Sequence, residues 1–238
     1  MHTILCIAGF GDNASMFDRL LDMPLAQEHQ LIALNLPGFG ARTLRGETTL
    51  QSLAAFVADK ARDRGATVVV AHSVASIIAS LAATIPGSPL TTILSLEGNL
   101  TADDAYFSGT AASYDDPGTF HSAFVTRVAD MGRKAPIMKR YRSAIAKADP
   151  RALWQLGCDA HRFSGEHVPG DVLAAAGDVT YFYNPENCPA ASLEWLAAHP
   201  MKRVVLENAS HWASVDCPQL LSARIIEALP REPDEGRA

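Results

Sequence analysis

Residues 66–85 contain the feature that most restricts the fold of this chain, an apolar strand that passes almost directly into an apolar helix. The strand is predicted over residues 66–71 (ATVVVA) and the helix over residues 74–85 (VASIIASLAATI). An uninterrupted apolar strand of this kind is typical of a sheet that is buried on both faces. We therefore expect helices on both sides of the sheet that contains this strand.

Other apolar segments continue the alternation of strand and helix. Further strands are predicted over residues 3–8, 30–36, 90–96, 179–183 and 203–206, each of them short and buried. Further helices are predicted over residues 13–21, 49–64, 193–198 and 218–229. Thr48 or Thr49 is expected to cap the helix 49–64, and Gly65 is expected to end it. The alternation predicts an α/β fold, with a mostly parallel sheet, right-handed crossovers and helices on both faces.

Residues 100–177 interrupt this alternation. The segment is rich in aromatic residues and has few β-branched runs. We expect it to be a mainly helical insertion that covers the carboxyl ends of the strands as a lid. The α/β core would then comprise residues 1–99 and 178–230, and the charged tail 231–238 is expected to be disordered.

Ser73 lies at the junction between the apolar strand and the apolar helix. A sharp turn at such a junction lifts a serine hydroxyl out of the backbone and places the next amide at a helix N-terminus. The surrounding residues are Ala71, His72, Val74 and Ala75, so small residues occupy both glycine positions of the pattern G-x-S-x-G. The alternative is a serine that only caps the helix.

Three further loops resemble those of one known family. Residues 7–12 (IAGFGD) resemble an H-G-x-G loop after the first long strand, and residues 34–40 (LNLPGFG) resemble a D-x-P-G-x-G loop with Asn35 replacing aspartate. Residues 209–212 (ASHW) resemble the G-x-x-H loop that carries a catalytic base. Together with Ser73, these loops make the chain similar to the α/β-hydrolase superfamily, to serine esterases with an inserted lid. The leading antiparallel strands of that fold are expected to be missing.

The resemblance implies a catalytic triad with Ser73 as the nucleophile and His211 as the base. In most relatives the acid is an aspartate after the strand 179–183, but Asn184 occupies that position. Some hydrolases of the superfamily place the acid after the preceding strand, where this chain has Glu97. We favour Glu97 over the alternative Glu186.

The resemblance also predicts the groups that would bind the substrate. The backbone N–H groups of Phe10 and Val74 are expected to bind the oxyanion. The expected reaction is hydrolysis of an ester or related acyl bond of a small molecule, without a cofactor. Aromatic residues suggested as pocket lining are Tyr106, Phe107, Phe124, Tyr141 and Trp212.

Three other functions remain open at this stage. The same triad also suits a C–C bond hydrolase or a lactonase, and some proteins of this fold only bind ligands. The third alternative is an NAD(P)-dependent oxidoreductase, because Gly9, Gly11 and Ala14 fit the dinucleotide pattern G-x-G-x-x-A. That pattern needs an acidic residue after the second strand, where Asn35 stands.

Composition excludes other classes of partner. The net charge is −6 and there is no basic run, which argues against nucleic acid as a partner.

No signal peptide or membrane-spanning stretch is expected, so we predict a cytoplasmic protein. The four cysteines have no short-range framework and are expected to be reduced. Cys158, His161 and His167 do not fit a zinc pattern, and the oligomeric state has no sequence signal.

Overall fold

The computed structural model describes residues 1–132 and 135–230, and its centre is a six-stranded parallel sheet. The spatial order of the strands is β2-β1-β5-β6-β7-β8, and every pairing is parallel. The strands are β1 (Thr3–Ile7), β2 (Gln30–Leu34), β5 (Val68–His72), β6 (Thr92–Leu96), β7 (Asp178–Tyr183) and β8 (Lys202–Val205). Two short strands after β2, β3 (Leu36–Pro37) and β4 (Gly40–Ala41), pair separately. The expected tail 231–238 lies outside the described residues.

The strand order distinguishes between the predicted α/β folds. Counted along the chain, the order of the main sheet is 2-1-3-4-5-6, whereas the dinucleotide-binding fold has 3-2-1-4-5-6. The side-chain oxygen of Asn35 accepts a hydrogen bond from Ala14 N (2.9 Å), at the place where a ribose-binding carboxylate would be needed. The structure therefore does not support the oxidoreductase alternative.

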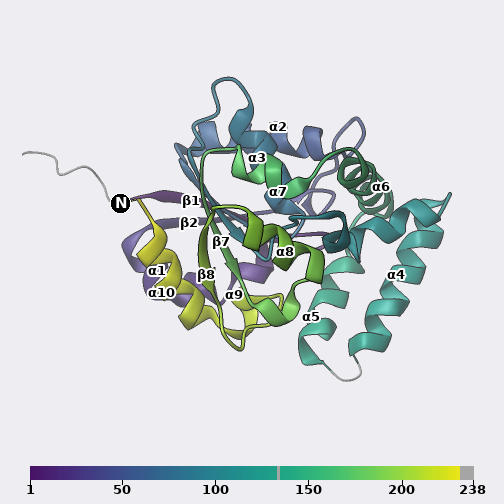
Figure 1. Cartoon of the computed structure of the whole chain (residues 1–238). Coiled ribbons are helices and arrows are strands. Elements are labelled where there is room, and N and C mark those ends of the chain that lie inside the picture. The colour runs from purple at the N-terminus through teal and green to yellow at the C-terminus, as the bar shows by residue number, and fades with distance from the viewer. Residues whose placement is uncertain (133–134, 231–238) are drawn as a thin grey trace, which may run out of the picture.

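Helices cover both faces of the sheet, as predicted (Figure 1). On one face α2 (Leu50–Arg64) packs on α3 (Ala75–Thr84), which packs on α7 (Pro169–Ala174). On the other face α1 (Pro24–Glu28) and α9 (Ala213–Asp216) pack on α10 (Pro218–Ala228), while α8 (Ala190–Ala198) joins β7 to β8. Thr49 caps α2 and Gly65 ends it with φ of 62°, as the sequence predicts.

Two predictions about local structure are wrong. Residues 13–21 form no continuous helix but two short 3₁₀ helices, η1 (Ala14–Phe17) and η2 (Leu20–Asp22). The Asn13 side chain caps the first, and the second ends in extended backbone at Met23. Strands β2 and β8 are also less buried than predicted, because they are the two outer strands and each has a neighbour on one side only.

The segment between β6 and β7 is mainly helical, as predicted. It contains η3 (Ala102–Ala105), η4 (Ser108–Ser113), α4 (Pro117–Gly132), α5 (Pro136–Ile145), α6 (Pro150–Glu166) and α7. In Figure 1, α4 and α5 lie beyond the end of the sheet that is opposite the N-terminus. Backbone and side-chain hydrogen bonds attach α6 to the core: Asp149 N donates to Gly38 O (2.9 Å), and Asp159 accepts from Leu50 N (2.8 Å).

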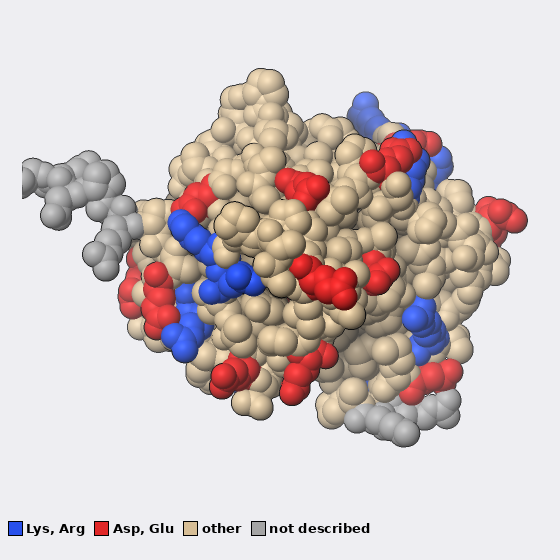
Figure 2. Space-filling model, viewed as in Figure 1, with Lys and Arg blue, Asp and Glu red and all other residues tan. Residues whose placement is uncertain are grey.

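The surface has no continuous basic field on the face that Figure 2 shows. Lysine and arginine side chains occur there in small groups between acidic ones. Within residues 1–132 and 135–230, no helix is long and apolar enough to cross a membrane.

Candidate active site

Ser73 occupies the sharp turn that the sequence predicts between β5 and α3. Its φ is 54°, in the left-handed region that non-glycine residues adopt rarely and at an energetic cost. The backbone N–H of Ser73 donates to Leu96 O (3.0 Å), which fixes the turn against the end of β6. Ala71 and Ala75 are fully buried, whereas Ser73 is half-buried. The turn thus exposes the serine and buries its neighbours.

Gly9, after β1, allows the next loop to approach this turn. A Cβ atom on Gly9 would lie 2.8 Å from His72 Nδ1 and 2.9 Å from Ser73 Cβ. No side chain can occupy that space without moving the serine. The glycine of the loop 7–12 is therefore required by close contact with the turn at Ser73.

His211 and Glu97 meet at the same end of the sheet. His211 follows β8, and its Nδ1 lies 3.7 Å from Glu97 Oε2, the separation of an ion pair and longer than a hydrogen bond. Their side chains are 14% and 3% exposed, so little solvent screens the pair. Ser73 and His211 line one pocket. The structure thus brings together all three residues of the predicted triad.

Glu97 is held in an orientation that leaves one oxygen for His211. Its other oxygen, Oε1, accepts hydrogen bonds from Asn184 N (2.8 Å) and Asn187 Nδ2 (3.0 Å). Its φ is 50°, so Glu97, like Ser73, lies in strained backbone directly after a strand. Glu186 is exposed, and within the described chain its carboxylate has no hydrogen bond or ion pair. The geometry favours Glu97 over Glu186.

Two asparagines that the sequence analysis did not assign connect Glu97 with the loop of His211. Asn184 Nδ2 and Asn187 Nδ2 both donate to Ala209 O, at 2.8 and 3.1 Å. Asn184 stands where the family resemblance implies an aspartate, and its backbone N–H donates to Glu97 instead. The asparagine in place of the expected aspartate was the sequence signal for a different role of residue 184. No sequence feature indicated the contact between Asn187 and Glu97.

His72 also supports the loop of His211, a role that the local sequence around Ser73 does not predict. Its Nε2 donates to the carbonyl oxygen of His211 (2.8 Å), and the two rings are 4.6 Å apart. His72 Nδ1 is buried without a partner. Burial, followed by the charge of a protonated His211, lowers the pKa of His72 well below its usual value. His72 is therefore a neutral donor.

The neutral state of His72 predicts a pH dependence of stability. Below a pH of about 6.5 the unfolded chain binds a proton at this histidine and the folded chain does not, so stability is lost as the pH falls. Between pH 7.5 and 5.0 the wild type should lose about 2 kcal/mol more unfolding free energy than His72→Gln, which keeps a neutral donor. Urea unfolding at both pH values measures this. Equal losses in the two proteins would contradict the assignment.

Two backbone N–H groups near the turn at Ser73 are unpaired in the described structure. In the part of the chain that the structure describes, the N–H groups of Phe10 and Val74 donate to no protein acceptor. Val74 N is at the N-terminus of α3, where negative charge is favoured. Two residues of α5 hold the loop 7–12, which contains the Phe10 N–H. Tyr141 Oη donates to Phe10 O (2.6 Å), and Arg140 binds both carboxylate oxygens of Asp12 (2.7 and 2.8 Å).

The pocket around Ser73 is narrow. The volume open to a water-sized sphere is about 10 Å³, which is room for about one water molecule. The suggested aromatic residues contribute to its wall with one exception: Phe124 is buried a layer deeper, against Phe10, Phe107 and Phe120. The lining residues are Gly9, Phe10, Asp12, His72, Ser73, Asp104, Tyr106, Phe107, Ser108, Tyr141, His211 and Trp212.

Cysteine offers no competing nucleophile near this pocket. All four cysteines are free thiols. Burial, with the charges of Glu97 and Asp104, raises the pKa of Cys188 to about 12, so it stays protonated at neutral pH. Among residues 1–132 and 135–230, no group of three or more His, Cys, Asp or Glu side chains could hold a metal ion.

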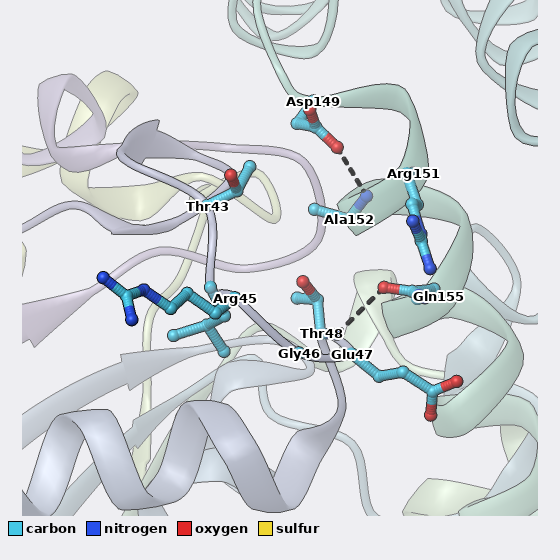
Figure 3. Close-up of a pocket in the computed structure, with 10 residues that line it drawn as sticks. Thr43, Arg45, Gly46, Glu47, Thr48, Asp149, Arg151, Ala152 and Gln155 are labelled. Carbon is cyan, nitrogen blue, oxygen red and sulfur yellow. Dashed lines mark hydrogen bonds between the residues drawn. The ribbon is translucent and has the colours of Figure 1, made fainter.

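A second, more open pocket of about 270 Å³ lies between the loop 43–48 and the start of α6 (Figure 3). The Asp149 side chain accepts from Ala152 N there, and Gln155 accepts from Thr48 N. Arg45, Arg151 and two carboxylates give it mixed charge. It shares no lining residue with the Ser73 pocket and contains no nucleophile paired with a base.

Solved structures resemble this fold over nearly its whole length. An esterase from Thermogutta terrifontis superposes with a TM-score of 0.72 at 18% identity, covering 95% of this chain and 89% of the other. Est816, described as an N-acyl homoserine lactone degrading enzyme, gives 0.69 at 17% identity, with 95% and 93% covered. A protein described as recognising and cleaving the ring of the Pseudomonas quinolone signal gives 0.74 at 16%, with 96% and 91% covered.

The sequence itself matches a family. No curated protein matches it. A sequence model of the alpha/beta hydrolase family, however, matches residues 4–224, which is nearly the whole chain and includes Ser73, Glu97 and His211. By this match, the chain belongs to the α/β hydrolase family.

Proposed function

We propose that this protein is a serine hydrolase that cleaves an ester or related acyl bond of a small molecule. His211 accepts the proton of Ser73 as the serine oxygen attacks the carbonyl carbon. Glu97 holds the imidazole in the required tautomer and stabilises its protonated form. The N–H groups of Phe10 and Val74 bind the oxyanion, and His211 then activates the water that hydrolyses the acyl-enzyme.

One observation carries this proposal: the half-buried Ser73 shares its pocket with His211, whose other side faces a buried carboxylate at 3.7 Å. A serine that only capped α3 would not need this arrangement. The unpaired N–H groups of Phe10 and Val74, two donors beside one nucleophile, suit hydrolysis better than simple ligand binding.

Lactones and carbon–carbon bonds next to a carbonyl are the alternative substrates. They need the same nucleophile, base and oxyanion donors, so the named residues do not choose among them. The described activities of the similar structures, a lactone-degrading enzyme and a ring-cleaving protein, make both classes worth assaying beside simple esters.

The helical segment 100–177 is proposed to act as a lid. The pocket has room for about one water molecule, and residues of this segment, including Tyr106, Phe107 and Tyr141, form part of its wall. A substrate therefore enters only when part of the segment moves. Closure around the substrate excludes water from the oxyanion site.

Tyr141→Phe tests the connection between α5 and the oxyanion loop. The change removes the hydroxyl that donates to Phe10 O (2.6 Å) and keeps the buried ring. Without this hydrogen bond, the loop that contains the Phe10 N–H is held less firmly in the position needed to bind the oxyanion. We therefore expect kcat to fall about tenfold with KM nearly unchanged. Steady-state kinetics with an activated ester measures both constants. A rise in KM alone would assign Tyr141 to substrate binding instead.

Pre-steady-state kinetics with p-nitrophenyl acetate tests the proposed function. An acyl-enzyme mechanism predicts a burst of p-nitrophenol of about one equivalent, together with a mass increase of one acetyl group on the peptide that contains Ser73. A linear time course without acetylation of that peptide would contradict the proposal.

A further inference from the structure

Asp104 is a carboxylate in the wall of the Ser73 pocket that the proposed mechanism does not use. It belongs to η3, in the segment between β6 and β7. All hydrogen bonds to its side chain end on one oxygen, Oδ2. The donors are Leu100 N (2.8 Å), Thr101 N (2.9 Å), Ser192 Oγ (2.6 Å) and Thr101 Oγ1 (3.4 Å). The three shorter bonds hold the carboxylate in a single orientation, and the Thr101 hydroxyl, 2.8 Å from Ser192 Oγ, orients that serine.

The second oxygen, Oδ1, accepts nothing within the described part of the chain. It is also absent from the buried polar atoms that lack a partner, so this oxygen of a pocket-lining residue retains contact with solvent. Burial raises the pKa of Asp104, which shows that the carboxylate has lost part of its solvation. A rigid, poorly solvated acceptor gains more from a ligand donor than an exposed carboxylate does.

The charges around the pocket leave Asp104 without a cation. No lysine or arginine is among the residues that line the pocket, and the nearby Arg140 is engaged by Asp12 in a bidentate pair. Glu97 is committed to Asn184, Asn187 and His211. Among the described residues, no lysine or arginine of the pocket wall balances this acidic group, which disfavours substrates with a carboxylate.

A second residue of the pocket wall also carries a polar group without a partner. Trp212 lines the same pocket, is 6% exposed, and its Nε1–H has no acceptor. Buried polar groups in folded proteins are usually paired. The residues of the pocket wall thus include a free acceptor at Asp104 and a buried, unpaired indole N–H at Trp212.

We propose that Asp104 Oδ1 binds a hydrogen-bond donor of the substrate, an ammonium or hydroxyl group carried at a distance from the scissile carbonyl. This inference rests on the proposed hydrolysis at Ser73 and adds the substrate class. The enzyme selects esters that carry such a donor over plain alkyl esters and over esters that carry only an acceptor.

The experiment compares p-nitrophenyl hexanoates with ammonium, hydroxyl, methoxy or no substituent, at carbon 3 or carbon 6 of the acyl chain. In the wild type, the ammonium or hydroxyl ester at one of these positions should have a kcat/KM at least about tenfold above that of the plain ester. The methoxy ester, which has no donor, should show no such gain.

Asp104→Asn reverses the polarity at this point. The three donors around Oδ2 require an oxygen, so the amide NH₂ group takes the place of Oδ1. The preference for the ammonium ester should disappear, and the methoxy ester should gain relative to the plain one. Ratios between substrates report this, because a merely structural loss lowers all of them together. Asp103→Asn, at the exposed neighbour, is the matched control and should keep the wild-type ratios.

Three results separate the two proposals. Equal kcat/KM for donor and plain esters at both positions, with Ser73 acetylated by an activated ester, overturns the role of Asp104 alone. An unchanged preference in Asp104→Asn does the same. Absence of both turnover and acetylation overturns the proposed function.

Discussion

Ser73→Ala is expected to lose ester hydrolysis, with a fall in kcat on the order of 10⁶-fold. The turn at φ of 54° places Ser73 in the pocket that His211 also lines. The oxyanion donors remain, so a small acceleration over the uncatalysed reaction should persist. Steady-state assays with an activated ester measure the loss.

The controls for this variant are measurements of its stability and of its substrate binding. The left-handed backbone conformation at residue 73 costs alanine no more free energy than it costs serine. The urea midpoint should therefore change little. Substrate should still bind, since the pocket keeps its wall. Activity within tenfold of the wild type would mean that another residue attacks the carbonyl.

Glu97→Gln is expected to lower kcat by roughly 10²- to 10⁴-fold at neutral pH. Glutamine keeps the size of the side chain and can still accept from Asn184 N and Asn187 Nδ2. It cannot stabilise a protonated His211, and its NH₂ group favours the wrong tautomer of the ring. Activity measured across the pH range should show that raising the pH does not restore kcat.

Glu186→Gln is the matched control, because it changes the alternative acid of the same loop region. Its carboxylate is exposed and has no partner in the described chain, so activity should stay close to the wild type. The reverse pattern, with full activity in Glu97→Gln and loss in Glu186→Gln, would transfer the role of the acid to Glu186.

Local sequence predicted most of the sheet and the turn at Ser73. The apolar segments before and after Ser73 had to be buried, and β5 and α3 follow them closely. The position of Glu97 after β6 was also predictable, because parallel strands bring their carboxyl ends to one edge. The helix expected over residues 13–21 failed because Asn13 caps a short 3₁₀ turn there.

The supporting contacts were not predictable, because they join residues that are far apart in the sequence. His72 and the carbonyl of His211 are 139 positions apart, and Tyr141 and Phe10 are 131 apart. Their pairing depends on how β8 and α5 are placed by the whole fold. The free oxygen of Asp104 is a similar case, since it depends on which oxygen Ser192 and two backbone amides occupy.

Labelling with a fluorophosphonate tests the central claim most directly. The probe phosphonylates a serine only when a base and an oxyanion site activate it. We predict stoichiometric labelling of the folded protein, with the adduct mapped by peptide mass spectrometry to Ser73, and no labelling of Ser73→Ala or of urea-unfolded protein. An unlabelled Ser73 in the folded wild type, or an adduct at another serine, would contradict the account.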